Sequence, residues 1–352
     1  AGIMVSASHN PAEDNGLKVL DSAGLKLDDA VEDELESLIW RSEELPGAPP
    51  ERIGRAFDAQ FRLERYLEHR LALARRIRTD LRVVLDCANG SGGVVAPRIL
   101  EATGARVEVI HNDPDGLNIN AGCGATAPES LARRVVEAGA DVGFALDGDA
   151  DRLIAVDARG RVVDGDQILG ILALDRLARN ALPNGALVVS VLSNGGLQRA
   201  VEARGGQVIR TPVGDKYILD GMIVVGAGLG GEKSGHVIVL EHTTSGDGIV
   251  TALELLDVIV RTGRSLADLA AEIPLYPQQQ RTVRVRHKDQ WEGDPVIARA
   301  IREAEARLDG GRVIVRPSGT EPAIRVMVEG RDAAVVAELA DAIAAVAGER
   351  LN

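Results

Sequence analysis

The stretch Leu81-Arg82-Val83-Val84-Leu85-Asp86-Cys87, followed by Asn89-Gly90-Ser91-Gly92-Gly93, decides the fold class of this chain. An apolar run that ends in a glycine-rich turn predicts a buried strand leading into a helix. A helix-like segment follows at 94–102, and a second apolar run lies at 106–110. This order predicts a β-α-β unit, in which a helix joins two parallel strands.

The same alternation continues along the chain. A helix at 128–138, a strand at 142–146 and a hairpin pairing 153–156 with 161–163 complete the first unit. A second α/β unit is expected next, with helices at 167–179, 196–203, 215–221, 249–261 and 266–272 and strands at 187–191, 207–210, 223–226 and 236–240. Pro274 and Pro277 then break the pattern, and the mixed strands and helices from 282 onward predict a small α+β domain.

The composition excludes several classes of protein. The 352 residues carry 40 Lys and Arg against 53 Asp and Glu, a formal charge of −13. We therefore expect neither nucleic acid nor an anionic membrane as a partner, since both attract basic surfaces. No apolar run reaches the roughly 18–20 residues of a membrane span. Two cysteines, Cys87 and Cys123, are too few for a disulfide framework, which favours the cytoplasm.

The first of four polar clusters is Ser6-Ala7-Ser8-His9-Asn10-Pro11, directly after an apolar segment at 2–6. A serine held in a turn between His and Asn could act as a nucleophile, with Lys18 as an acid or base. The same letters are also typical of a structural Asx or serine turn.

The second cluster is Asp147-Gly148-Asp149-Ala150-Asp151-Arg152, after the strand at 142–146. Three carboxylates separated by small residues can converge on one hard divalent cation, and an arginine beside them can bind phosphate. The alternative is a solvated acidic turn. An EF-hand is disfavoured because position 12 of the loop is Ala158.

The third and fourth clusters suggest ligand recognition. In the segment 230–236, Glu232, Ser234 and His236 alternate, so on a strand they would share one face and could bind sugar hydroxyls. The alternative is a glycine-rich edge strand. The fourth cluster combines guanidinium groups, hydroxyls and a glycine, as a phosphate cradle does, although an ordinary turn has similar letters. Its residues are Arg316, Ser318, Gly319, Thr320 and Arg325.

Together the four clusters describe phosphoryl transfer on a phosphorylated sugar. In order along the whole chain, they resemble the motifs of the α-D-phosphohexomutase superfamily. Three further segments resemble its bacterial phosphoglucosamine mutase branch, at 213–217 (including Asp215 and Lys216), 243–248 and 324–330.

The resemblance implies an α/β fold of three similar domains plus a C-terminal α+β domain around a central cleft. The corresponding domain boundaries are 1–68, 69–163, 164–275 and 276–352. It also implies phosphoglucosamine mutase activity through a phosphorylated Ser8, with glucosamine 1,6-bisphosphate or glucose 1,6-bisphosphate as activator. A phosphosugar is the expected partner, and a homodimer is compatible with the resemblance.

Residue roles follow from the same resemblance. Ser8, His9 and Lys18 are expected to be catalytic, and the Ser8 phosphate is expected to share Mg²⁺ with Asp147, Asp149 and Asp151. The sugar phosphate is expected to contact two groups of residues. The residues expected to bind the sugar are Arg152, Asp215, Lys216, Glu232, Ser234 and His236. The five residues of the fourth cluster are expected to bind the phosphate that is not transferred.

Two departures and three alternatives accompany this interpretation. Ala150 stands where a glycine is common, which predicts a negative φ there. The chain starts at Ala1, and we expect a truncated first domain that lacks an arginine near Ser8, with impaired turnover. The alternatives are a phosphoglucomutase or phosphomannomutase, a haloacid-dehalogenase-like phosphatase with Asp147 as nucleophile and Asp149 as acid or base, and a non-catalytic phosphosugar-binding protein.

Overall fold

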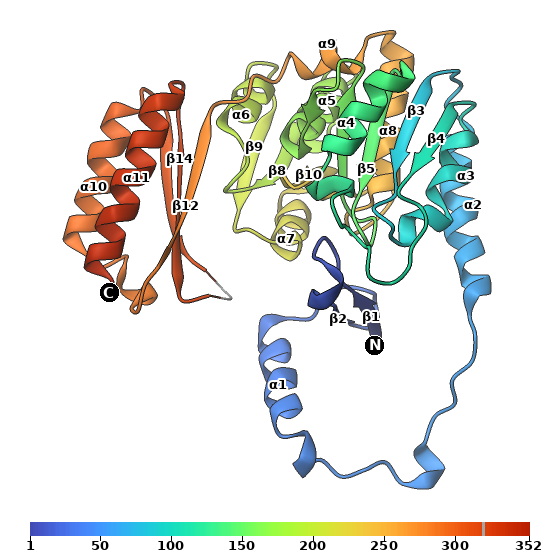
Figure 1. Cartoon of the computed structure of the whole chain (residues 1–352), viewed down its shortest axis with the longest axis horizontal. Helices are drawn as coiled ribbons and strands as arrows, with labels where there is room; N and C mark the ends of the chain where they lie inside the picture. Colours follow the sequence, from blue (N-terminus) through green and yellow to red (C-terminus); the bar gives the residue numbers. More distant parts are fainter. Residues whose placement is uncertain (319–320) are drawn as a thin grey trace.

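The computed structural model describes residues 1–318 and 321–352. Its N-terminal unit is an antiparallel hairpin of β1 (Gly2–Ser6) and β2 (Gly16–Leu20), followed by α1 (Asp29–Trp40). A long segment with only short 3-10 turns then leads to α2 (Leu63–Ala74). Figure 1 shows the tip of the hairpin pointing toward the sheets of the central part of the chain.

The first central sheet has five strands in the order β4-β3-β5-β6-β7. The β-α-β unit expected from the sequence forms, since β3 pairs in parallel with β4 and β5. The antiparallel strands β6 and β7 complete the sheet as a hairpin. The strands are β3 (Arg82–Asp86), β4 (Arg106–Ile110), β5 (Val142–Leu146), β6 (Leu153–Asp157) and β7 (Val162–Val163), with helices α3 (Ala96–Glu101) and α4 (Glu129–Ala138).

The second central sheet has the order β11-β10-β8-β9. Its strands β8, β9 and β10 are parallel and β11 is antiparallel. The strands are β8 (Ala186–Ser190), β9 (Gln207–Thr211), β10 (Leu229–Gly231) and β11 (Val237–Val239). The helices are α5 (Gly165–Ala178), α6 (Gly195–Glu202), α7 (Asp215–Val225), α8 (Gly248–Thr262) and α9 (Leu266–Ala270).

The prediction of a strand at 223–226 is wrong. These residues end α7, and the strand begins only at Leu229. Ile218 and Met222, four residues apart, are buried, whereas Val224 is 84% exposed, so the apolar run has the period of a helix. Gly226, with φ of +65°, then ends the helix in the left-handed conformation.

The two central sheets share one hydrophobic core. Buried side chains from both contribute to it, for example Leu85 and Leu146 from the first and Leu187 from the second. The backbone also joins the two, because Leu153 N donates to Gly235 O at 3.0 Å and Arg152 forms an isolated bridge with His236. The aspartate loop is thereby fixed against the loop that carries His236.

The C-terminal unit has its own core and stands beside the rest (Figure 1). An antiparallel sheet of order β12-β14-β13 packs against two helices. The elements are β12 (Gln278–Arg284), β13 (Arg312–Pro317), β14 (Ala323–Glu329), α10 (Pro295–Arg307) and α11 (Ala333–Arg350). Among the described helices of the whole chain, none has the length and apolarity needed to span a membrane.

Candidate active site

The aspartate loop begins where β5 ends, at the edge of the sheet where parallel strands place ligand-binding groups. The carboxylates of Asp147, Asp149 and Asp151 each offer an oxygen within 4.8 Å of the others. One oxygen of each carboxylate is buried and lacks a hydrogen-bond partner among the described residues. Three converging, unpartnered carboxylate oxygens are the ligands that a hard divalent cation requires, so the donor set fits Mg²⁺.

The three carboxylates differ in acidity. Burial and the two neighbouring aspartates raise the pKa of Asp147 to about 8. Burial also acts on Asp151, but the adjacent His236, Lys18 and Arg152 outweigh it and lower the pKa of that carboxyl to about 2. At pH 7 the Asp147 carboxyl is therefore mostly protonated, whereas the Asp151 carboxyl is ionised.

The Ser8 loop lies directly against the aspartate loop, 143 residues away in sequence. Ser6 Oγ donates to Asp149 Oδ2 at 3.1 Å, and Lys18 Nζ donates to the same oxygen at 2.7 Å. Gly148 allows this approach, because a Cβ there would lie 2.5 Å from Ser8 O. The structure thus brings together two clusters that the sequence analysis treated separately.

Ser8 has an unusual backbone. Its φ of +53° is in the left-handed region, which is sparsely populated by residues other than glycine. Its N–H donates to Ser6 Oγ at 2.8 Å, and its hydroxyl lies 3.3 Å from His9 Nδ1. Burial and the nearby Arg152 lower the pKa of His9, so its imidazole is neutral at pH 7 and can accept a proton. For Lys18 the ion pair with Asp149 outweighs burial and raises the pKa, which keeps the amine charged.

Asn120 also belongs to this site, although the sequence analysis did not select it. Its Nδ2 donates to Ser8 O and to Asn10 O, both at 2.8 Å, so one amide group clamps the serine turn from the first central sheet. Asn120 is only 9% exposed. It lies in a loop between β4 and α4 with no local motif, and its proximity to Ser8 arises only on folding.

Ala150 differs from the expectation as well. Its φ is +60°, not negative. The turn is closed by Ala150 N donating to Asp147 O at 3.0 Å and by Arg152 N donating to Asp147 Oδ1 at 3.1 Å. The loop geometry therefore demands a left-handed residue at this position, and the alanine adopts it at a cost of about 1 kcal/mol.

The third cluster does not form a strand face. Residues 232–235 make the turn between β10 and β11, so Glu232, Ser234 and His236 point to different surroundings. Glu232 Oε1 accepts from Gly214 N at 3.1 Å, and Ser234 Oγ is buried without a partner among the described residues. His236 Nε2 accepts from Gly246 N at 3.0 Å, which leaves Nδ1 as the donor toward Asp151, 3.5 Å away. His236 thus supports the aspartate loop directly.

Asp215 and Lys216, at the start of α7, contact the N-terminal unit. Asp215 Oδ1 accepts from Lys26 Nζ at 2.6 Å, and Lys216 Nζ donates to Asp29 Oδ1 at 2.6 Å. The sequence analysis did not select Lys26 or Asp29, which only the tertiary structure places here. A cavity of about 1010 Å³ joins these groups to the aspartate loop, and its lining includes Lys18, Asp149, Asp151, Asp215, Lys216 and His236.

The fourth cluster lies in the C-terminal unit and does not line that cavity in the described part of the chain. Arg316 and Arg325 are direct neighbours across β13 and β14. Burial and the Arg325 charge lower the pKa of Arg316, although Glu232 acts in the opposite direction. Ser318 Oγ is buried and unpartnered among the described residues, while Gly319 and Thr320 lie outside them. Two adjacent guanidinium groups beside a buried hydroxyl fit an anion.

Comparison with known proteins identifies the family. Residues 1–46, 64–160, 164–276 and 282–346 match domains I, II, III and IV of phosphoglucomutase/phosphomannomutase, of which I to III are described as alpha/beta/alpha and IV as C-terminal. The phosphoglucosamine mutase of Moorella thermoacetica is 51% identical, over 94% of this chain and 75% of that protein. The chain belongs to the phosphoglucosamine mutase family. The phosphoglucosamine mutase of Carboxydothermus hydrogenoformans is 48% identical over 98% of this chain and 78% of its own length.

The fold agrees with this family assignment. The crystal structure of Aspergillus fumigatus N-acetylphosphoglucosamine mutase in complex with GlcNAc-6P and magnesium superposes with a TM-score of 0.80 at 21% identity, covering 100% of this chain and 89% of that one. The resemblance to the phosphohexomutase superfamily and the α/β architecture expected from the sequence are thereby confirmed. The protein is accordingly an enzyme of the phosphohexomutase class.

Proposed function

We propose that this member of the phosphoglucosamine mutase family interconverts glucosamine 6-phosphate and glucosamine 1-phosphate through a phosphorylated Ser8. The observation that carries the proposal is the docking of the Ser8 loop on Asp149, beside three carboxylates that each keep an oxygen without a hydrogen bond to the described residues. This arrangement suits phosphoryl transfer, in which positioning and charge compensation supply most of the catalysis.

Each group at the serine turn has a distinct task. The Ser8 hydroxyl carries the phosphoryl group, and the carboxylates of Asp147, Asp149 and Asp151 would hold Mg²⁺. When bound, Mg²⁺ offsets negative charge on the transferring group. His9, neutral and 3.3 Å from Ser8 Oγ, accepts the serine proton as the phosphoryl group returns. Lys18 stays charged beside Asp149 and orients the transferred phosphoryl oxygens.

The other clusters hold the two ends of the substrate. Glu232, Ser234 and Arg152 face the sugar, and Arg316, Ser318 and Arg325, together with Gly319 and Thr320, hold the phosphate that is not transferred. Asp215 and Lys216 close the cavity against the N-terminal unit. In the reaction, phosphorylated Ser8 transfers its phosphoryl group to glucosamine 6-phosphate, which gives a 1,6-bisphosphate. The bisphosphate reorients in the site and returns its other phosphoryl group to Ser8. The arginine pair accepts either phosphate, which permits this reorientation. Either glucosamine 1,6-bisphosphate or glucose 1,6-bisphosphate would phosphorylate Ser8 before the first turnover.

The competing activities fit less well. A haloacid-dehalogenase-like phosphatase would use Asp147 as nucleophile, but this side chain is fully buried and its Oδ1 accepts from the backbone of Arg152. A phosphoglucomutase or phosphomannomutase would share the machinery, and the family relationship favours the amino sugar. The two free, buried cysteines fit the reducing cytoplasm, where we place the reaction.

The decisive experiment follows the phosphoryl group on Ser8. The protein is incubated with Mg²⁺ and glucosamine 1,6-bisphosphate, mapped for phosphopeptides, and then chased with glucosamine 6-phosphate. We expect an acid-stable phosphate on the Ser8 peptide that disappears during the chase, and no mutase activity in Ser8→Ala. Parallel chases with glucose and mannose phosphates rank the sugars. An acid-labile adduct on Asp147, or wild-type turnover by Ser8→Ala, would contradict the proposal.

A further inference from the structure

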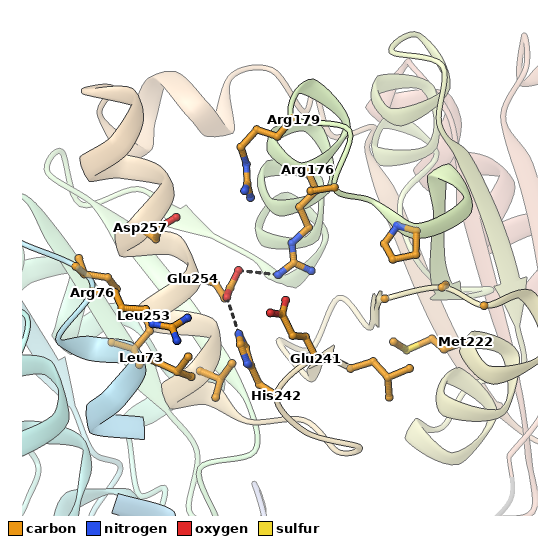
Figure 2. Close-up of a pocket in the computed structure, with 18 of the residues that line it drawn as sticks. Leu73, Arg76, Arg176, Arg179, Met222, Glu241, His242, Leu253, Glu254 and Asp257 are labelled. Carbon is orange, nitrogen blue, oxygen red and sulfur yellow. Dashed lines mark hydrogen bonds and ion pairs between the residues drawn. The ribbon is translucent and has the colours of Figure 1, made fainter. Parts of the chain in front are cut away.

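A second cavity, of about 830 Å³, shares no residue with the proposed catalytic and phosphate-binding groups. Its walls come from the end of α2, from α5, from the turn after α7, from the segment after β11 and from α8 (Figure 2). The volume is in the range of cavities that bind small organic molecules. The position, between helices of the two central units, is also typical of such sites.

The lining of the second cavity combines apolar side chains with charges of both signs. Leu73, Met222 and Leu253 supply apolar surface. The charged groups are three guanidinium groups and three carboxylates, namely Arg76, Arg176, Arg179, Glu241, Glu254 and Asp257. A mainly apolar wall with a few polar groups is the usual design of a specific small-molecule site.

Some of these charges are already paired. Glu254 accepts from Arg176 Nη2 at 2.7 Å and lies 3.2 Å from His242 Nε2, as Figure 2 shows. These contacts outweigh burial and lower the pKa of Glu254, so this carboxylate stays ionised and holds both partners in place. Arg179 pairs with Asp175 at 2.8 Å and Asp257 pairs with Arg261 at 3.3 Å, in both cases with a partner outside the lining. The floor of the cavity is therefore a preorganised polar network.

Two lining charges have no ion-pair partner within 4.0 Å in the described part of the chain. These are Arg76, which lies two residues after the end of α2, and Glu241, from the segment after β11 (Figure 2). A simple anion would be attracted to Arg76 and repelled by Glu241, and a simple cation would meet the opposite problem. A ligand with separated positive and negative groups would satisfy both residues.

We propose that the second cavity binds a small zwitterion that carries a phosphate and an ammonium group on a short carbon skeleton. Arg76 faces the phosphate, Glu241 faces the ammonium group, and the apolar wall packs against the carbon atoms. Guanidinium groups bind phosphate through paired hydrogen bonds, which makes the phosphate end the anchor. An amino sugar phosphate belongs to this chemical class, and its choice as the probe rests on the proposed function.

The second cavity and the catalytic cavity share their walls. Helix α2 contributes Leu73 to the former and Arg70 to the latter, and Ile223 of α7 lines both. The segment that begins with Glu241 continues into the catalytic cavity as residues 243–247. The second cavity therefore lies next to residues 243–247, whose Gly246 N donates to His236.

The test measures binding with the catalytic cavity already filled. Ser8→Ala protein, which cannot transfer phosphate, is saturated with Mg²⁺ and glucose 1,6-bisphosphate and titrated calorimetrically with glucosamine 6-phosphate. We expect one remaining site. The affinity of this site for glucosamine 6-phosphate should fall at least tenfold when Arg76→Ala or Glu241→Ala is added to the Ser8→Ala protein. Without these additions, the site should bind glucose 6-phosphate, which lacks the ammonium group, and glucosamine, which lacks the phosphate, at least tenfold more weakly. The neighbouring Arg75→Ala, exposed and outside the lining, is the matched control.

Arg76→Ala and Glu241→Ala alter exposed side chains that form no ion pair with residues 1–318 or 321–352, so both variants should fold normally. Absence of residual binding would overturn the proposal, as would residual binding that neither variant weakens. A failure of the proposed function has a different signature. In that case glucose 1,6-bisphosphate would not fill the catalytic cavity. Glucosamine 6-phosphate would then show a second binding event, whose affinity Arg76→Ala does not change.

Discussion

Two residues of the candidate site have left-handed backbones, one in the serine loop and one in the aspartate loop. Ser8 and Ala150 have φ of +53° and +60°, and neither is a glycine. Such conformations persist where surrounding contacts hold them, and they concentrate at functional sites. For Ser8 those contacts are the hydroxyl of Ser6 and the side chain of Asn120. The serine hydroxyl is thus presented by a strained turn that distant residues stabilise.

Asn120→Ala should reduce turnover more than it reduces stability. Loss of the Nδ2 donor leaves the carbonyls of Ser8 and Asn10 without this partner, and the serine turn relaxes. A shift of about 1 Å in a reacting group can lower the rate about 10²-fold, so we expect a loss of that order in kcat. Steady-state kinetics and the rate of Ser8 phosphorylation by the bisphosphate measure it.

Leu117→Ala, at an 80% exposed position in the same loop, is the control and should behave like the wild type. A kcat for Asn120→Ala within twofold of the wild-type value would show that the turn holds its geometry without the clamp.

At the level of elements, the helices α2 and α8 are joined by a buried ion pair. Arg70 Nη2 lies 2.8 Å from Asp247 Oδ2, and both side chains are less than 10% exposed. Tyr66 OH also donates to Asp247 Oδ2, at 3.0 Å. The other carboxylate oxygen of Asp247, Oδ1, caps the start of α8. One carboxylate therefore anchors a helix of the second central unit to the helix that follows the long N-terminal segment.

Arg70→Ala should lower the free energy of unfolding by about 3 kcal/mol, because it leaves the buried Asp247 charge without its principal partner. Urea denaturation followed by circular dichroism measures the change. Arg65→Ala, on the exposed side of the same helix, should change stability by less than about 0.5 kcal/mol. Equal midpoints for the two variants would mean that Tyr66 and solvent replace the guanidinium group.

At the level of the whole molecule, the candidate site combines loops from structural units that are far apart in the sequence. The N-terminal hairpin supplies the serine, the first central sheet supplies the aspartates, and the second supplies His236. The arginine pair remains on the C-terminal unit, outside the catalytic cavity. A substrate that touches both the aspartate loop and the arginine pair would extend beyond the lining of this cavity.

Magnesium should stabilise the assembled site. At a Mg²⁺ concentration about 100 times the dissociation constant, binding to the native state alone adds about 2.7 kcal/mol to the free energy of unfolding. Thermal unfolding with and without MgCl₂ measures this increment, which should be lost in Asp149→Asn and kept in the exposed Glu349→Gln. An increment that survives in Asp149→Asn would place the cation elsewhere.

The sequence by itself determined the local features. Apolar periodicity placed most strands and helices, since burial selects period 2 or 3.6 within a single element, but it did not predict β2, α1 or β10. The motifs located the serine turn and the aspartate loop, because their chemistry is carried by neighbouring residues. The same reasoning failed where a short apolar run suited either element, as at Ile223–Val225, which is the end of a helix.

Only the tertiary structure decided which distant groups meet. Asn120 lies 112 residues from Ser8, and His236 contacts Asp151 from another sheet. No local pattern records such pairs, because the free energy that places them comes from packing the shared core of the two central sheets. The left-handed Ala150 has the same origin, since the three carboxylates can converge only if the backbone between them turns this way. The second cavity, too, exists only between helices that the fold brings together.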